Sequence, residues 1–298
     1  MKRINLAMIL ACSSTALHAG EIQWGMGDIE VSGGLFGING TLTDSADTYT
    51  LKSEPKKLFS ERGFYHYSIN YYTPANLTQI GGEDVPFTNG YVQTPSIDFE
   101  WQGIDGQITT GYHILYQGPR DYLGIGVSLG IAAPWVKNTG VSMQDYTPID
   151  IDFPTLPQLP GINQVADYIA STTDMFGYKV GPKVMASHSI GAHFSVFADI
   201  SIATQQMNVS NDTFKFSTQL GGHYLSYGIG ARYQLYKERF QAGRIDLEPQ
   251  LYLTAGYKHA QLTMDEFAID FMNIGLPLPE TEMTFKANSY YLGIGYDF

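Results

Sequence analysis

The chain ends on Tyr290-Tyr291-Leu292-Gly293-Ile294-Gly295-Tyr296-Asp297-Phe298, where apolar residues alternate with small or polar ones. Successive side chains of a β-strand point to opposite sides, so a period of two separates the two faces of one strand. One face of this stretch is apolar throughout, and the other carries Gly293, Gly295 and Asp297. The pattern therefore predicts a strand that lies between two different surroundings.

The same alternation recurs at 122–135, 224–236 and 244–258, with Gly, Ser and charged residues opposite the apolar face. Each stretch is longer than the ~5–6 residues of a typical globular strand, and long enough to cross a bilayer at a tilt. Small residues suit the crowded interior of a barrel. The sequence predicts an all-β, up-and-down antiparallel transmembrane β-barrel, with a soluble secreted β-sandwich as the alternative.

A chain that stops on an aromatic residue, with apolar residues at alternate positions upstream, resembles the C-terminal assembly signal of Gram-negative outer-membrane β-barrel proteins. The resemblance covers the last strand and the general alternation, and it indicates no specific family. It implies a location in the bacterial outer membrane. The implied partners are the lipid bilayer, lipopolysaccharide and the barrel-assembly machinery, which would bind the strand that ends at Phe298. The oligomeric state is left open.

The N-terminus predicts export. Lys2 and Arg3 precede an apolar segment, and small residues with cleavage positions at Ala16 or Ala19 follow. We expect residues 1–19 to be a signal peptide and residues 20–298 to form one barrel domain. Cys12, the single cysteine, lies in the signal peptide, so the mature chain would have no disulfide. The alternative is a lipoprotein that is acylated at Cys12.

Composition excludes several classes of protein. The formal charge is -12, and loss of Lys2 and Arg3 would take it to -14, which disfavours nucleic acid as a partner. Mean hydropathy is -0.12, and no uncharged apolar run of about 18 residues occurs in the body of the chain, so spanning helices are not expected. We find no cofactor motif.

The alternation also gives a strand count. We expect ten strands, because an even number returns both termini to one side, and eight strands with an N-terminal extension are the alternative. Long external loops are expected near 75–100, 137–177 and 260–285. The predicted strands are 28–42, a weak one near 48–58, 62–73, 104–117, 121–135, 178–188, 192–206, 223–236, 244–259 and 286–298.

Charged residues of both signs occupy positions predicted to face the lumen. Such groups must pair or stay hydrated. They predict either an internal network of ion pairs that plugs the barrel, or a charged constriction that selects solutes. The predicted lumen charges are Lys179, Lys183, Asp199, Arg232, Asp246 and Glu248.

Two predicted external loops share a pattern. Ile151-Asp152-Phe153 and Ile269-Asp270-Phe271 are each followed by a Leu-Pro repeat, and Ile97-Asp98-Phe99 repeats the first part. Residues 162–176 have the spacing of a short amphipathic helix. Apolar residues in loops should cover something, so these loops are predicted either to pack as a cap or to line an entrance.

Two constellations could carry catalysis. His193 and Ser195 share a strand face, as in outer-membrane lipid hydrolases, but Asp199 would lie about 13 Å from His193, too far to orient its ring. Asp150 and Asp152 could hold calcium or serve hydrolysis, yet no His-Asp motif resembling outer-membrane aspartyl-type proteases accompanies them. We therefore expect no enzyme activity, no catalytic residues and no metal site.

The leading functional hypothesis is a small-solute channel or ligand-binding and transport barrel, gated by the apolar, Pro-rich loops. The first alternative is a structural or surface-interaction barrel, adhesin-like, with a plugged lumen. The second is a lipid-acting hydrolase. Nothing in the sequence identifies the solute.

Overall fold

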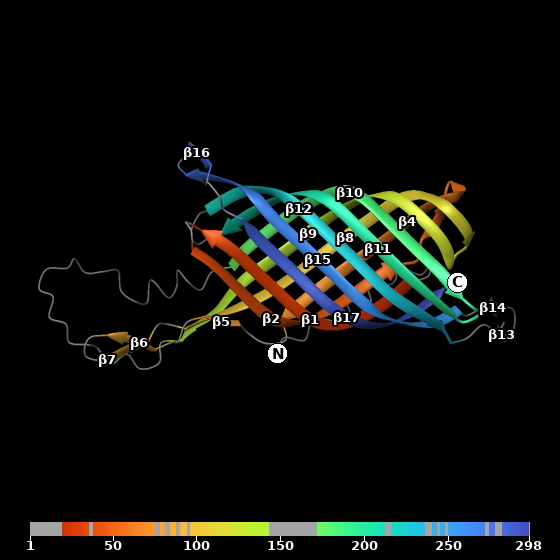
Figure 1. The fold of residues 1–298 in the computed structure, drawn as a ribbon, viewed down its shortest axis with the longest axis horizontal. Coiled ribbons are helices and arrows are strands. Elements are labelled where there is room, and N and C mark those ends of the chain that lie inside the picture. The colour runs from red at the N-terminus through yellow and green to blue at the C-terminus, as the bar shows by residue number, and fades with distance from the viewer. Residues whose placement is uncertain are drawn as a thin grey trace, which may run out of the picture.

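The chain forms a closed antiparallel barrel of ten strands (Figure 1). The wall strands are β1 (Gly20–Leu35), β2 (Ile38–Ser53), β4 (Ser60–Pro74), β8 (Ser96–Gly118), β9 (Asp121–Ser142), β10 (Thr172–Ile190), β11 (Phe194–Asn211), β12 (Phe216–Gln234), β15 (Gln250–Phe271) and β17 (Met283–Asp297). The computed structural model describes residues 20–35, 38–74, 78–80, 84–87, 90–93, 96–142, 172–211, 216–235, 240–242, 245–247, 250–271, 274–277 and 282–297.

The barrel closes where its first and last strands meet. β1 pairs with β17 from Gly20 opposite Tyr296 to Gly33 opposite Met283, and every other wall strand pairs with its neighbours along the chain. The ladder therefore has no free edge, which is the condition for a sheet inside a membrane. No helix long and apolar enough to cross a membrane occurs in the described part of the chain.

The two ends of the barrel differ (Figure 1). One end, called here the turn end, has the short turns between β8 and β9 and between β10 and β11, and also the end of β17. Gly191, in the second turn, has φ of 78°, a conformation that favours glycine. The other end, called the loop end, carries the two longest connections, between β4 and β8 and between β9 and β10, whereas the connection from β12 to β15 lies at the turn end. The short strands are β3 (Lys56–Leu58), β5 (Thr78–Ile80), β6 (Asp84–Phe87), β7 (Gly90–Gln93), β13 (Phe240–Ala242), β14 (Ile245–Leu247) and β16 (Ile274–Pro277).

The prediction of ten strands is confirmed, but two N-terminal boundaries are wrong. The predicted strand 28–42 spans the end of β1, a hairpin turn and the start of β2, and the weak strand near 48–58 covers the end of β2 and β3. Ile29, Val31 and Leu35 alternate with Glu30, Ser32 and Gly34, but Leu35 pairs with Ile38, so this alternation belongs to β1 alone. Pro55, outside both strands, interrupts the second segment.

The predicted strand 244–259 also begins too early. Residues 245–247 pair with 240–242 in a separate hairpin, and β15 starts only at Gln250. At the loop end, the wall strands extend into all three ranges that were predicted as loops. The 22 or 23 residues of β8, β9 and β15 exceed the roughly 9–11 that cross a bilayer, so the wall continues beyond it.

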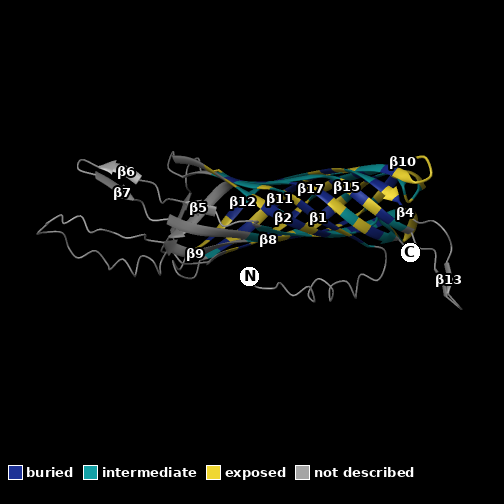
Figure 2. Cartoon of the chain, turned by 90° about the horizontal axis from the view of Figure 1, so that it is seen from below, coloured by how far each residue is buried: buried dark blue, intermediate teal, exposed yellow. Residues whose placement is uncertain are grey.

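The alternation predicted from the sequence appears directly in the wall, where exposed and buried residues form a chequered pattern (Figure 2). Near the turn end, the outward residues are mostly apolar and the inward ones are Gly, Ser, Thr or charged. A Cβ at Gly230 or Gly256 would come within 2.6 Å of the Tyr291 hydroxyl, so these glycines make room for lumen side chains. The exposed belt includes Ile22, Trp24, Met26, Ile108, Tyr112, Ile125, Val127, Leu129, Ile131, Ile200, Ile202, Ile229, Leu253, Tyr290, Leu292 and Ile294.

Toward the loop end the two faces of the wall exchange character: the outward residues become polar and the inward residues become apolar. On β1 the outward residues change from Met26 to Asp28 and Glu30, and on β11 from Ile202 to Thr204 and Gln206. Inward residues at this level become apolar, so the barrel has an inverted upper section with a polar outside and an apolar inside. Its buried cluster, called here the upper core, consists of Ala132, Met175, Met207, Val209, Leu220, Leu262 and Met264, with Met283 and Phe285 packed against it.

Aromatic residues mark the level of this exchange. The rings of Tyr227 and His259 stack with centroids 4.8 Å apart, and those of Tyr257 and Tyr290 lie 5.1 Å apart. The Tyr257 hydroxyl donates to Asn288, at the first polar level of β17. Aromatic residues that contact water on one side and apolar surroundings on the other are typical of a membrane interface. The belt between this level and the turn end is therefore the section that lipid would surround.

A charge placed in the belt tests this assignment. Leu129, on β9, is 62% exposed and lies in the middle of the wall. We expect Leu129→Arg to lower the free energy of unfolding in lipid vesicles by about 2–4 kcal/mol, because an arginine there would face hydrocarbon. Gln117→Arg, at the exposed turn end of β8, is the control and should cost less than about 1 kcal/mol. Equal losses for both variants would contradict a lipid-facing belt.

Candidate functional site

Four ion pairs occupy the lumen between the belt strands. Lys179 pairs with Asp105, Arg232 with Glu54, Lys183 with Asp199 at 3.4 Å, and Lys52 with Glu21 at 3.4 Å. Lys179 on β10 reaches past β9 to Asp105 on β8, so this contact bridges non-adjacent strands. Because such bridges run through the interior, they narrow the lumen.

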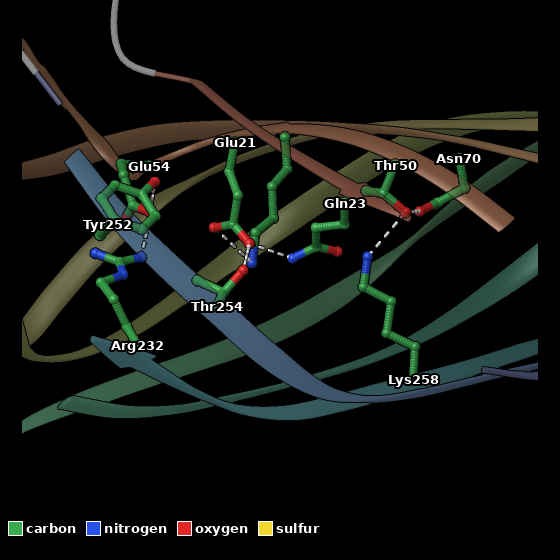
Figure 3. Close-up of polar contacts among 10 residues, drawn as sticks. Glu21, Gln23, Thr50, Glu54, Asn70, Arg232, Tyr252, Thr254 and Lys258 are labelled. Atoms are coloured by element: carbon green, nitrogen blue, oxygen red, sulfur yellow. Dashed lines mark hydrogen bonds and ion pairs between the residues drawn. The ribbon is translucent and has the colours of Figure 1, made fainter. Parts of the chain in front are cut away.

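The bridge nearest the turn end is built on a segment outside the wall. Glu54 follows β2, and its carboxylate accepts hydrogen bonds from Arg232 and, at 2.9 Å, from the Tyr252 hydroxyl (Figure 3). The Arg232 guanidinium also lies 4.2 Å from the centre of the Tyr252 ring. The carboxylate and the stacked cation hold the β2–β3 connection against β12 and β15.

A second group surrounds Glu21 at the start of β1. Its carboxylate accepts hydrogen bonds from Gln23 and, at 2.5 Å, from the Thr254 hydroxyl (Figure 3). Lys52 supplies the opposite charge and also lies 4.5 Å from the centre of the Phe197 ring. Glu21 is fully buried, so a cation and two donors are what such a carboxylate requires.

A third group lies closer to the upper core. The Lys179 ammonium, besides its pair with Asp105, lies 3.7 Å from the centre of the Tyr224 ring. Lys183 donates to Gln107 at 3.4 Å, and Gln107 donates to Ser201 at 3.1 Å, which spans from β8 to β11. These contacts separate the turn-end half of the lumen from the upper section.

Lys258 differs from the other lumen cations. Its ammonium donates to the Thr50 hydroxyl at 2.9 Å, and Thr50 donates to Asn70 at 2.8 Å (Figure 3). It also lies 4.9 Å from the centre of the Tyr291 ring. Among the residues that the structure describes, no carboxylate lies within 4.0 Å of the Lys258 ammonium.

Two cavities lie along the barrel axis. The polar cavity has a volume of about 120 Å³, and its lining includes Lys52, Glu54, His66, Lys183, Asp199, Arg232 and Lys258. The apolar cavity has a volume of about 80 Å³ and lies under the upper core, with a lining that includes Ile29, Ala132, Gln205, Leu262 and Phe285. Tyr72, Tyr224, Ala260 and Ala287 line both cavities, so the two are neighbours.

The structure places four of the six predicted lumen charges in the barrel interior. Lys179, Lys183 and Arg232 are buried and Asp199 is half-buried, each with an ion-pair partner. Asp246 was misplaced, because it lies on β14 of the turn-end hairpin and not on a wall strand. Glu248 lies outside the described residues.

Several lumen residues were missed by the sequence reasoning. Glu21 and Lys52 were missed because β1 was predicted to start at residue 28 and β2 was judged weak. Glu54 follows a strand, where alternation gives no signal. Asp105 and Lys258 were detectable, since each alternates with outward apolar neighbours on a predicted strand.

The predicted loop residues have different outcomes. Some of them lie outside the described residues, namely Asp150, Ile151, Asp152, Phe153 and the range 162–171. Ile269, Asp270 and Phe271 are not in a loop: they form the end of β15 and pair with β16. The alternation continues through them because the strand runs past the membrane level.

The candidate hydrolase residues do not form a site. Ser195 is 1% exposed inside the barrel, whereas His193 is exposed in the turn that precedes β11, with its ring 6.2 Å from that of Tyr233. No hydrogen bond joins the two among the described residues. No group of three or more His, Cys, Asp or Glu with a metal-binding arrangement occurs in the described part of the chain.

His188 and Asp121 connect the two short turns. The Asp121 carboxylate accepts a hydrogen bond from the Ser189 backbone N–H at 2.8 Å and lies 3.0 Å from Nδ1 of His188. The backbone N–H of Ser189 holds the pKa of Asp121 below its ordinary value, because it stabilises the charged form. The contacts indicate a structural role outside the lumen.

Comparisons with known proteins give only distant similarities. No family model and no curated protein matches the chain. The outer membrane protease OmpT from Escherichia coli is 9% identical, with a TM-score of 0.48, and the match covers 94% of this chain and 97% of that chain. The translocator domain of the autotransporter NalP from Neisseria meningitidis is 9% identical, with a TM-score of 0.34 and coverage of 98% and 94%.

The toluene transporter TodX from Pseudomonas putida is also similar. It is 11% identical, with a TM-score of 0.31, and the match covers 99% of this chain and 94% of that chain. At these values the comparisons give no information about activity. The function has to be argued from the side chains of this chain.

A double-mutant cycle on the Lys179–Asp105 pair tests the network. We expect Lys179→Met or Asp105→Leu alone to cost about 3–5 kcal/mol of unfolding free energy, because each leaves a buried charge without its partner. The double variant should cost less than the sum, measured by urea unfolding in vesicles. The control pair is Lys286 and Glu30, which lie 2.8 Å apart on the outer face and are about one-third exposed.

For that control pair, the same substitutions should couple by no more than about 1 kcal/mol. A Lys179–Asp105 coupling as small as the control would mean that water, and not the partner, solvates these charges.

Proposed function

We propose that the protein is an outer-membrane barrel that binds a small, largely apolar ligand in the apolar cavity beneath its upper core. The loop end faces the exterior, because long connections gather there and outer-membrane barrels keep short turns on the periplasmic side. The ligand enters from that end. The segment 143–171 and the β15–β17 connection would control entry, as the apolar, Pro-rich sequences of this region suggest.

Gln205 is the observation that carries this proposal. Its side chain is 5% exposed and lines the apolar cavity, and neither its amide nitrogen nor its oxygen has a hydrogen-bond partner among the described residues. A buried polar group without a partner costs about 1–3 kcal/mol. A ligand with one donor and one acceptor on an otherwise apolar body would satisfy both atoms. The cavity thus combines an apolar wall with one point of polar recognition, as ligand sites typically do.

The lumen contacts argue against a pore that stays open. Porins keep a polar, water-filled interior, whereas here the Lys179–Asp105 and Arg232–Glu54 pairs span the interior beyond neighbouring strands, and the upper section is apolar inside. Passage of a solute would require these bridges to rearrange. The resting barrel is therefore a binding barrel with a closed lumen, and transport would be a further step.

We also propose that the barrel is not an enzyme. Ser195 is enclosed by the wall, and His193 lies in a turn outside it, so neither can activate the other at a lipid-facing surface. Hydrolysis of phospholipid that disappears in Ser195→Ala would contradict this.

A surface-interaction barrel remains the second candidate. The closed lumen suits it as well, and the upper section presents a polar outer surface beyond the belt. The two candidates differ in what the apolar cavity does, because a purely structural barrel would gain nothing from a small ligand.

Conductance tests the closed lumen. We expect the mature chain in a planar bilayer to show no steady openings, because the ion pairs bridge the interior. Replacing Glu54 and Arg232 together with alanine should raise the conductance. Replacing Lys57 and Glu61, an exposed pair in the neighbouring segment, should not. Steady openings of the unchanged protein would indicate a channel.

Ligand binding tests the cavity. We expect benzyl alcohol to bind about 2- to 12-fold more tightly than toluene, because only benzyl alcohol can exchange hydrogen bonds with Gln205. Gln205→Leu should remove this preference. The measurement is calorimetric titration of barrel-loaded nanodiscs, with empty nanodiscs subtracted.

Position 132 provides a control for that measurement. Ala132→Trp should block the cavity, whereas Ala255→Trp, on the exposed outer face, should leave binding unchanged. No binding of either probe above the level of empty nanodiscs would reject the binding barrel in favour of a surface role.

A further inference from the structure

The polar cavity has more positive than negative charge. Its lining includes four cations, Lys52, Lys183, Arg232 and Lys258. The first three have carboxylate partners in Glu21, Asp199 and Glu54, and Lys258 has none among the described residues. One ammonium group, on a half-buried side chain, therefore faces the cavity without a counter-ion among these residues. A partly buried charge without a partner is unfavourable, so such a site favours an anion.

The Lys258 ammonium is the donor that stays available here, because the hydroxyl of Thr50 already gives its one proton to Asn70. Thr50 accepts from Lys258 and donates to Asn70, so one of the three ammonium protons is used and two remain available. His66 lines the same cavity and is 7% exposed, and its Nδ1 has no hydrogen-bond partner in the part of the chain that the structure describes. A carboxylate has two oxygens that can accept from such groups. One negative charge on the ligand is enough to balance the cavity, since Lys258 is the one lining cation without a carboxylate partner among the described residues.

The position of Lys258 links this cavity to the apolar one. Ala260, two residues further along β15 on the same face, lines both cavities, and Leu262 lines the apolar cavity. At about 3.3 Å per residue, the backbone positions of 258 and 262 are about 13 Å apart. A molecule with a ring and a short chain can therefore have its apolar part near Leu262 and its acid near Lys258.

We propose that Lys258 binds the carboxylate of a small amphipathic monocarboxylic acid whose apolar part occupies the apolar cavity. This inference rests on the proposed function and specifies its ligand class. Lys258 recognises the acid together with His66, which lines the same cavity and donates in its Nδ1–H form. The upper core encloses the apolar part of the ligand, and a hydroxyl group on that part would satisfy Gln205. Tyr72 and Tyr224, which line both cavities, flank the passage between the two parts of the ligand.

The test compares 3-phenylpropionate with 3-phenylpropanol, which has the same apolar part without the charge. Both are titrated calorimetrically into barrel-loaded nanodiscs, with empty nanodiscs subtracted. We expect the acid to bind at least about tenfold more tightly than the alcohol, the range of a charge-assisted hydrogen bond. Lys258→Met should abolish this advantage and leave the alcohol unchanged, and Lys258→Arg should restore part of it.

Lys57→Met is the control, because Lys57 is an exposed lysine that lines neither cavity and pairs only with the exposed Glu61. We expect Lys258→Met to fold, since it leaves no carboxylate without a partner. A competition experiment on the unchanged protein needs no variant. Excess acetate should displace 3-phenylpropionate and leave 3-phenylpropanol bound.

The outcomes separate the inference from the function on which it rests. If the alcohol binds but the acid has no advantage, the inference is overturned and the binding barrel stands. If neither binds, the proposed function itself fails. If acetate alone binds as tightly as 3-phenylpropionate, the cavity holds a free small anion, and the amphipathic ligand is overturned.

Discussion

Each wall strand has to fit the outside of the barrel with one face and the lumen with the other, because its successive side chains point to opposite sides. The rest of this structure depends on that constraint and on the level at which the polar face changes from the inside to the outside. Near the turn end, hydrocarbon would lie outside and paired charges lie inside. Beyond Asp28 and Asn288 most outer residues are polar, although Phe176 and Tyr178 of β10 are exposed, and the inner residues form the upper core. A strand that crosses this level needs no change in its backbone, only a change in which alternate residue is apolar.

The exchange also explains why the interior contains two kinds of cavity. Charges in the belt section pair with one another, two of the pairs between neighbouring strands and two over a longer span, and Tyr224 and Tyr252 stack on two of the cations. Above that section, water lies outside the wall, and burial of the four methionines and Phe285 stabilises it as in a soluble protein. The apolar cavity lies where these two kinds of packing meet. Packing is difficult to complete at such a junction, because ion pairs and methionines require different neighbours.

Most of the fold was predictable, because a long alternating stretch such as 122–135 predicts both the strand and which of its residues share a face. The errors have physical causes. At the end of β1, Ile29 and Val31 belong to the inner face, so apolar residues there no longer mean lipid. The hairpin at 240–247 keeps a period of two, and sequence alone does not distinguish it from the wall. Half of the site was predictable from inward charges on good strands, such as Lys179 and Arg232. Asp105 was detectable in the same way, but Glu54 lies outside a strand, and which charges pair depends on how the barrel closes.

The position of Glu54 sets it apart from the other lumen carboxylates. Glu21, Asp105 and Asp199 are fixed on wall strands, so their distance to a partner changes only if the ladder of backbone hydrogen bonds deforms. Glu54 follows Ser53, the last residue of β2, and precedes Pro55, which has no backbone N–H to donate to a ladder. Of the four bridges, the Arg232–Glu54 pair is therefore the one that can separate while every wall strand keeps its register. If the lumen opens toward the turn end, the constraint on the wall makes the β2–β3 connection the element that moves.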